Sequence, residues 1–308
     1  MFTIAAAHHQ TELALIYVQN ASCIPGFSLH QVSTAPTSSS LIPTPLSLTS
    51  VSLPSFVINR SRNTILAKWL EERGVRVFNP AIVTDLCNDK RKTYEFLRKH
   101  GISFMETAYD IQTVTDWEYP FVVKPACGHG GDLVTLVGSK KELAEHLQKI
   151  KERYREHPGY VLQRCASDIG KDLRVYVLGG KIIASVMRST YDESFLQNLH
   201  LTEGSNFTSS IPDHSYIDIR SNYSLGHAAA LHTLTDEEET LVQRIIPLLP
   251  FDCIGIDFIY DKGHPVFNEI EDAVGARMLY ANSNIDLVSL YMNHIDHSMT
   301  SGFSVGSK

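Results

Sequence analysis

The feature that most restricts the fold is a pair of strand-like segments near the C-terminus that predicts a β-hairpin. Residues 251–260 and 264–270 are rich in apolar residues, and the turn-forming sequence Asp261-Lys-Gly263 separates them. Within the first segment, the nearly continuous apolar run 253–259 is interrupted by one carboxylate, Asp257. A buried carboxylate without a partner is strongly unfavourable, so this side chain must meet a cation or several hydrogen-bond donors.

The same hairpin predicts a cluster of carboxylates on one face of the two strands. If the turn centres near Gly263, Asp257 lies opposite Glu269. Side chains alternate along a strand, so Glu271 shares the face of Glu269, whereas Asn268 points away unless a bulge intervenes. Clustered carboxylates raise each other's pKa unless a multivalent cation neutralises them, and oxygen ligands suit Mg²⁺ or Mn²⁺. The alternative is a carboxylate patch that pairs with Arg or Lys side chains.

A second motif joins a lysine to a glycine-rich loop. Residues 121–124 predict a strand that ends in Lys124 before Pro125, and Gly128-His-Gly-Gly131 follows. The backbone N–H groups of such a loop can approach phosphate oxygens closely. The spacing is neither that of a Walker A loop nor that of a Rossmann fingerprint, and no hydrolase or kinase signature occurs. By itself the loop could also be an ordinary hairpin turn.

A second hairpin lies earlier in the chain and carries two arginines. Residues 172–178 and 181–188 flank Gly179-Gly180, which is a strong signal for a two-residue turn. Asp172 and Arg174 alternate to one face, but the register does not place Arg188 relative to them. The planar guanidinium group suits phosphate or carboxylate. The alternative is a solvated strand face with cross-strand ion pairs.

The remaining pattern predicts an α+β fold. The early part of the chain has α/β character, and antiparallel hairpins with packed helices follow it. Residues 31–55 are rich in Ser, Thr and Pro and predict a loop or linker, and 189–234 form a long polar stretch. Helices are expected around 65–70 (ended by Gly74), from Asn88 to Gly101, after the capping box of Ser139 and Glu142, over 236–247 and after Asp286. Further strands are expected over 13–18, 55–59, 75–78, 132–137 and 160–164.

Composition limits the partners and the compartment. The 308 residues carry a formal net charge of −7, which argues against a general nucleic-acid binder or a membrane-surface binder. The five cysteines are widely spaced and no CxxC pair occurs, which fits reduced thiols in a cytoplasmic protein. No apolar run reaches 18 residues, so a transmembrane helix is not expected. Residues 13–59 contain no Asp, Glu, Lys or Arg, and we expect this uncharged segment to contact a subunit or partner.

The ordered motifs resemble those of ATP-grasp ligases, in particular the branch typified by the ribosomal S6 glutamate ligase, the RimK-like enzymes. The resemblance covers roughly residues 56–296. No single motif is decisive, but the ordered set over this length is specific. The motifs are Cys87-Asn-Asp-Lys90, Val122-Val-Lys124-Pro, Gly128-His-Gly-Gly131, Gly170-Lys-Asp172-Leu-Arg174, Gly179-Gly, Arg188, Arg220-Ser-Asn222, Asp257 and Asn268-Glu269-Ile-Glu271.

The resemblance implies an α+β ATP-grasp fold in which two lobes clamp ATP, preceded by a shortened α/β lobe. The expected boundaries are 1–86 for the preceding lobe, 87–161 for the first ATP-grasp lobe and 162–308 for the second. The family often forms dimers or tetramers, so a homo-oligomer is one expectation, and neither a nucleic-acid nor a membrane partner is implied.

The resemblance also implies a role for each matching residue. The phosphates of ATP would be contacted by Lys90, Lys124 and the loop glycines Gly128, Gly130 and Gly131. The adenine would be lined by Gln163 and Arg164, the ribose would be held by Asp172, and Arg220 and Asn222 would lie near ATP. The phosphoryl or acyl-phosphate oxygens would face Arg174 and Arg188, and two Mg²⁺ (or Mn²⁺) ions would be bound by Asp257, Glu269 and Glu271, with Glu269 bridging them.

The implied reaction activates a carboxylate as an acyl phosphate, with release of ADP, and transfers it to an amine to form an amide. An amino acid such as glutamate is the expected substrate. Transfer to a carrier-protein thiol, as in antibiotic or peptide biosynthesis, is one alternative, and a non-catalytic ATP-binding scaffold is another. Retention of Lys124, Asp257 and Glu269 argues against the scaffold, because a degenerate site need not keep buried charges.

The sequence departs from the family pattern in three places. Glu271 stands where the last metal position is commonly Asn, which adds negative charge. The stretch between Arg188 and Arg220 is longer than expected, and long loops beside a site are often lids or specificity elements. The lobe before the first ATP-grasp lobe is short, with 31–55 in place of regular structure.

Overall fold

A short parallel β–α–β arrangement forms part of the first of two units. This computed structural model describes residues 15–19, 28–32, 53–155, 158–189 and 228–301. One unit comprises Met1–Thr84 with Asn284–Lys308, and the other comprises Asp85–Ser283. The division lies near residue 85, and residues 284–301 group with the N-terminal unit. The predicted division into three lobes stays a prediction.

In the first unit, β3 (Phe56–Ile58) pairs in parallel with β4 (Arg76–Phe78), and α2 (Thr64–Glu71) connects them. The side chain of Asn63 caps α2 by accepting a hydrogen bond from Leu66 N. Gly74 follows the helix with a φ of +79°, a conformation that a glycine adopts without steric cost. The helix and its end therefore match the prediction. The same unit holds the antiparallel pair β1 (Leu15–Gln19) and β2 (Ser28–Val32), and α9 (Leu287–Thr300).

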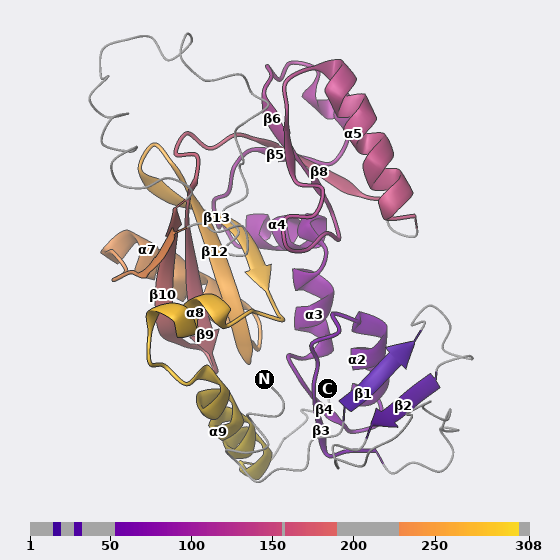
Figure 1. Cartoon of the computed structure of the whole chain (residues 1–308), viewed down its shortest axis with the longest axis vertical. Coiled ribbons are helices and arrows are strands. Elements are labelled where there is room, and N and C mark those ends of the chain that lie inside the picture. The colour runs from indigo at the N-terminus through magenta and orange to yellow at the C-terminus, as the bar shows by residue number, and fades with distance from the viewer. Residues whose placement is uncertain (1–14, 20–27, 33–52, 156–157, 190–227, 302–308) are drawn as a thin grey trace. The chain divides into compact units, whose positions relative to one another are not determined.

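The second unit contains a four-stranded antiparallel sheet in the order β5-β8-β6-β7 (Figure 1). Its strands are β5 (Thr107–Ala108), β6 (Phe121–Pro125), β7 (Thr135–Val137) and β8 (Tyr160–Arg164), with a 3₁₀ turn, η2 (Ile111–Val114), after β5. Helix α5 (Lys140–Arg153) covers this sheet and buries Leu143 and Ile150 against it. Ser139 Oγ accepts from Glu142 N at the start of α5, which confirms the predicted cap. The Glu142 side chain accepts from Gly138 N rather than from Ser139 N, so the second contact of the predicted capping box differs by one residue.

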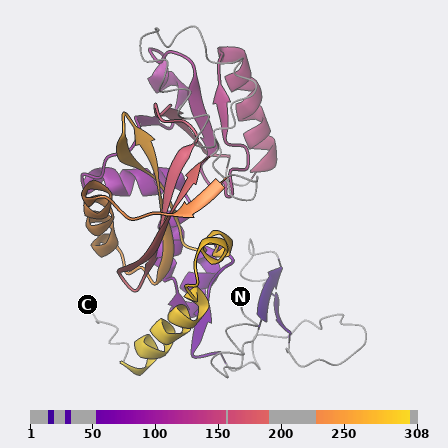
Figure 2. The same ribbon diagram turned by 60° about the vertical axis from the view of Figure 1, so that its left-hand side comes forward.

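A five-stranded antiparallel sheet, β11-β10-β9-β12-β13, forms the other part of this unit (Figure 2). Its strands are β9 (Lys171–Leu178), β10 (Lys181–Ser189), β11 (Ala228–Leu231), β12 (Cys253–Asp261) and β13 (His264–Glu271). Both predicted hairpins are present, and Gly179 and Gly180 form the first turn with positive φ angles. Three helical segments accompany the sheet: α7 (Asp236–Ile245), the 3₁₀ turn η5 (Ile246–Leu248) and α8 (Arg277–Asn282).

The register of the five-stranded sheet decides which charged residues meet. Strand β9 lies between β10 and β12, so Asp172 pairs with Arg188 on one side and Arg174 pairs with Asp257 on the other. Asp257 also lies opposite Glu269, as predicted. The register then shifts, because Phe258 pairs with Phe267. One residue of β13 is therefore left over as a β-bulge.

Some local predictions were wrong. Helix α4 (Lys90–Lys99) begins after Asp89 rather than Asn88, because the Asp89 side chain accepts from Arg91 N. Strand β11 lies inside 189–234, for which the sequence predicts only a long polar stretch, and the short helices α3 (Ala81–Cys87) and α8 are not among the expected elements. Within the described parts of the chain, no helix has the length and apolar character needed to cross a membrane.

Candidate functional site

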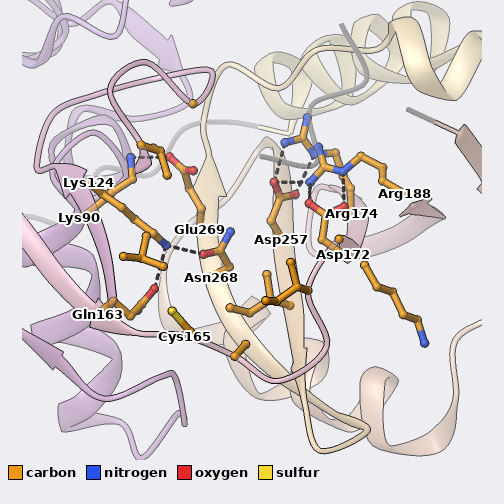
Figure 3. Close-up of a pocket in the computed structure, with 18 of the residues that line it drawn as sticks. Lys90, Lys124, Gln163, Cys165, Asp172, Arg174, Arg188, Asp257, Asn268 and Glu269 are labelled. Carbon is orange, nitrogen blue, oxygen red and sulfur yellow. Dashed lines mark hydrogen bonds and ion pairs between the residues drawn. The ribbon is translucent and has the colours of Figure 1, made fainter. Parts of the chain in front are cut away.

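A pocket in the second unit brings the predicted residues together. Side chains from both sheets, from α4 and from the glycine-rich loop line it (Figure 3). Arg220 and Asn222 lie outside the described residues. Every other predicted site residue lines this pocket: Lys90, Lys124, Gly128, Gly130, Gly131, Gln163, Arg164, Asp172, Arg174, Arg188, Asp257, Glu269 and Glu271.

Lys124, on β6, connects the two sheets across the pocket. Its Nζ donates to Gln163 Oε1 and to Asn268 Oδ1, each at 2.8 Å. Gln163 donates in turn from Nε2 to Thr107 Oγ1 at 2.9 Å, which fixes its amide. Burial, with a further effect of nearby Lys90, lowers the pKa of Lys124 to about 8. Both hydrogen-bond partners of this ammonium group are neutral amide oxygens, so its positive charge is available to bind an anion.

Lys90, the first residue of α4, makes a second connection. Its Nζ donates to the carbonyl oxygen of Gly128 at 2.7 Å and to Glu269 Oε1 at 2.9 Å. The side chain is 8% exposed, so this ion pair lies in a poorly solvated place. Lys90 thus joins the glycine-rich loop to strand β13. Lys90 and Lys124 face the pocket from the same side (Figure 3).

Asn268 is a pocket residue that the sequence did not assign. The bulge in β13 turns its amide toward Lys124, although strict alternation would point it away. Tyr94, fully buried in α4, donates from its hydroxyl to the Asn268 carbonyl at 2.8 Å and holds the bulge. Two signals in the sequence could have found this residue: the possible bulge, and its place in the motif Asn268-Glu269-Ile-Glu271.

The arginines and carboxylates form a buried network on the other side of the pocket (Figure 3). Arg174 donates from Nε and Nη2 to the two oxygens of Asp257 at 2.7 and 2.6 Å, and its Nη2 lies 2.9 Å from Glu271 Oε1. Arg188 makes a two-point contact with Asp172 and also donates to Asp257 Oδ2 at 3.0 Å. Such two-point pairs are among the stronger hydrogen-bonded contacts in proteins.

The network sets the charge of its central carboxylate. Burial alone would raise the pKa of Asp257, but Arg174 and Arg188 outweigh it and lower the pKa to about 2. Asp257 is therefore ionised at neutral pH, and each arginine has a carboxylate partner. The pairing of carboxylates with Arg and Lys, which the sequence left open, is thus present in the structure.

The same carboxylates have the donor chemistry of a magnesium site. Asp257, Glu269 and Glu271 offer only oxygen ligands, and the side chains of Glu269 and Glu271 keep 23% and 22% exposure toward the pocket. Among the described residues, however, no three His, Cys, Asp or Glu side chains are grouped as ligands of one ion would be. The donor type fits Mg²⁺, while the arrangement is one of ion pairs, so the metal site stays a prediction.

Arg164 lies at the rim of the pocket rather than at its centre. Its Nε donates to Glu106 Oε2 at 2.6 Å, and its guanidinium carbon lies 4.9 Å from the centre of the Trp117 ring. The side chain of Arg164 is 41% exposed, so it would contact the adenine ring of ATP only at the entrance of the pocket. Its adenine role, and the ribose role of Asp172, stay predictions.

Comparison with known proteins identifies the family. A family model described as an ATP-grasp domain matches residues 87–273. Human N-acetylaspartylglutamate synthase A is 28% identical over 248 residues, which cover 77% of this chain and 56% of that protein. Human beta-citrylglutamate synthase B is 24% identical over 263 residues, or 82% of this chain and 61% of that protein. The chain thus spans somewhat more than half the length of these relatives.

A solved structure agrees with this assignment. The RimK-domain ATP-grasp protein of Sphaerobacter thermophilus superposes with a TM-score of 0.54 at 16% identity, over 78% of this chain and 81% of that one. The predicted ATP-grasp resemblance and the α+β fold class are therefore confirmed. This chain belongs to the ATP-grasp family.

Proposed function

We propose that this chain is an ATP-dependent ligase that activates a carboxylate as an acyl phosphate and joins it to an amine. The observation that carries the proposal is one pocket with two buried lysines and a glycine-rich loop on one side and an arginine–carboxylate network on the other. Such a pocket can neutralise a triphosphate and a reacting carboxylate at the same time.

The lysines are the proposed phosphate ligands. Lys124 donates to neutral amide oxygens and Lys90 donates to Glu269. When ATP binds, phosphate oxygens would accept charge-assisted hydrogen bonds from both ammonium groups. Gly128, Gly130 and Gly131 would bring backbone N–H groups to the same phosphates. Gln163, Arg164 and Asp172 would contact the nucleoside, and Arg220 and Asn222 would lie near ATP.

The carboxylates are the proposed metal ligands. Asp257, Glu269 and Glu271 would hold Mg²⁺ or Mn²⁺, with two ions and Glu269 between them. When bound, the ions would supply charge neutralisation for the phosphates. Arg174 and Arg188 would then face the phosphoryl or acyl-phosphate oxygens, where their planar groups can donate two parallel hydrogen bonds.

The reaction needs positioning rather than a protein nucleophile. A carboxylate oxygen of the substrate attacks the γ-phosphorus, and the bond to the ADP oxygen breaks. The amine then attacks the acyl carbon, phosphate leaves, and the amine loses a proton. Glutamate occurs in the names of both human relatives, so we propose an amino acid such as glutamate as donor or acceptor.

The compartment and the assembly state belong to the same proposal. Cys87, Cys127, Cys165 and Cys253 are free thiols, which fits the reducing cytoplasm. A homo-oligomer is proposed from the family alone. Most of the uncharged segment 13–59 lies outside the described residues, and its proposed role as a contact surface is tested by deleting residues 20–50 and measuring assembly and activity.

Release of ADP tests the proposed reaction. The purified chain is incubated with ATP, Mg²⁺ or Mn²⁺ and a panel of amino acids, first singly and then in pairs. We expect ADP only with the correct carboxylate, and product masses that correspond to an amide. Glu269→Gln is expected to abolish turnover, whereas Glu145→Gln on the exposed face of α5 is the matched control.

The alternatives give different outcomes. Turnover that requires a carrier protein and yields a thioester would favour the thiol acceptor. Binding of ATP without turnover for any carboxylate would contradict the ligase proposal. Unchanged turnover in Glu269→Gln would contradict the metal-ligand role of Glu269.

A further inference from the structure

One wall of the pocket is a connecting loop that is fastened from outside the pocket. The loop follows β8 and leads into β9, and Cys165, Ala166, Asp168, Ile169 and Gly170 line the pocket. It would be free to move if only its ends were held. Loops of this kind need specific contacts if they are to keep one conformation.

Ser167 makes the first contacts with the turn between β12 and β13. Its backbone N donates to Asp261 Oδ1 at 3.0 Å. Its hydroxyl oxygen accepts from Lys262 N at 2.6 Å, and the same hydroxyl donates to Asp168 Oδ1 at 2.6 Å. Ser167 is exposed and is not among the residues that line the pocket.

Asp168 and Lys171 add further contacts. Asp168 accepts from Gly263 N through Oδ2 at 3.0 Å, and its own N donates to the Tyr260 carbonyl at 3.2 Å. At the far end of the loop, the ammonium group of Lys171 lies 4.2 Å from the centre of the Tyr260 ring. The loop is therefore tied to the hairpin in its middle and at its far end.

The turn itself is built to meet the loop. Lys262 and Gly263 both have positive φ angles, +53° and +81°, as in the tight two-residue turns that favour Asn-Gly or Asp-Gly. A lysine is unfavourable in this conformation. The backbone N–H groups of Lys262 and Gly263 both donate to the loop, so these contacts stabilise the positive φ angle of Lys262.

We infer that the contacts of Ser167 and Asp261 are a positioning device that holds the loop 165–170 in the shape needed to bind the nucleoside part of ATP. The inference rests on the proposed function. Ser167 and Asp261 do not line the pocket, so they act through the loop and not by touching the ligand. A loop that is already ordered loses less entropy when the nucleotide binds, which increases affinity.

Binding measurements on the full chain test this inference. Affinities for ATP and for inorganic tripolyphosphate are measured by calorimetry with Mg²⁺ present. Ser167→Ala and Asp261→Ala are each expected to weaken ATP binding about three- to tenfold, the range for one or two lost hydrogen bonds. Tripolyphosphate, which has no nucleoside, should bind as in the unchanged chain. Ser167→Thr and Asp261→Asn keep the acceptors and should restore ATP affinity.

Two controls separate positioning from general stability. Ser139→Ala removes the cap of α5, so it should lower thermal stability without changing ATP affinity. Lys262→Gly keeps the turn amide and should leave ATP affinity unchanged. The inference is overturned if both Ala variants bind ATP like the unchanged chain, or if ATP and tripolyphosphate weaken equally. If the unchanged chain itself does not bind ATP, the proposed function fails instead.

Discussion

Removal of the central carboxylate of the arginine network should destabilise the second unit strongly. Asp257 is the partner of both Arg174 and Arg188, whose side chains are 9% and 7% exposed. In Asp257→Ala, Arg188 keeps Asp172 and Arg174 keeps only one contact with Glu271. The two-point contact of Arg174 and one contact of Arg188 are lost in a poorly solvated place, and breaking a buried ion pair by removing one partner typically costs about 3–5 kcal/mol.

A second variant makes this prediction specific. Glu95 and Arg98 form an exposed ion pair on α4, with side chains 43% and 49% exposed. Glu95→Ala should therefore cost at most about 1 kcal/mol. Urea denaturation followed by circular dichroism gives the free energy of unfolding for each variant. A cost for Asp257→Ala no larger than that for Glu95→Ala would refute the idea that Asp257 stabilises the second unit through its buried contacts with the two arginines.

Three further predictions concern the lysine side of the pocket and the pH dependence of stability. Lys124→Ala should weaken ATP binding at least about tenfold, since a charge-assisted contact contributes about 1.5–3 kcal/mol; calorimetry that finds equal affinity would remove the phosphate role. Tyr94→Phe removes the hydrogen bond to the bulge at Asn268 and should cost about 1 kcal/mol of unfolding free energy, measured in urea. The pKa of Asp257 is lowered to about 2 in the folded chain, so its stabilising effect is present above about pH 4 and is lost as the pH falls toward 2. Acid titration should therefore show a smaller loss of stability in this pH range for Asp257→Asn than for the unchanged chain.

Local sequence signals were sufficient for most of the elements. Ser139 and Asp286 mark helix starts that the structure confirms, and Gly74 marks the end of the first predicted helix. The turn sequences at Gly179 and Gly263 place both hairpins. These signals involve residues only a few positions apart, so they can be read without knowledge of the fold. The miss at Asn88 has the same local origin, because Asp89 is an equally good cap one position later.

The chemical types of the site were also readable from the sequence, whereas their pairing was not. A carboxylate within an apolar strand, Asp257, required a cation, but several lysines and arginines were available. Strand β9 lies between β10 and β12, so Asp172 faces Arg188 and Arg174 faces Asp257. The order of strands in a sheet depends on long-range packing, and no local pattern contains it.

The sequence by itself determined the family, the two hairpins and many of the residues that line one pocket, because each depends on short motifs with fixed spacing. Only the tertiary structure decided how these residues contact one another. Lys124 and Asn268 are 144 positions apart and meet because a bulge turns one side chain across the pocket. The fastening of Ser167 to the turn at Lys262 likewise spans 95 positions. Such contacts form only when elements distant in the sequence pack together, so they can be identified only from the folded structure.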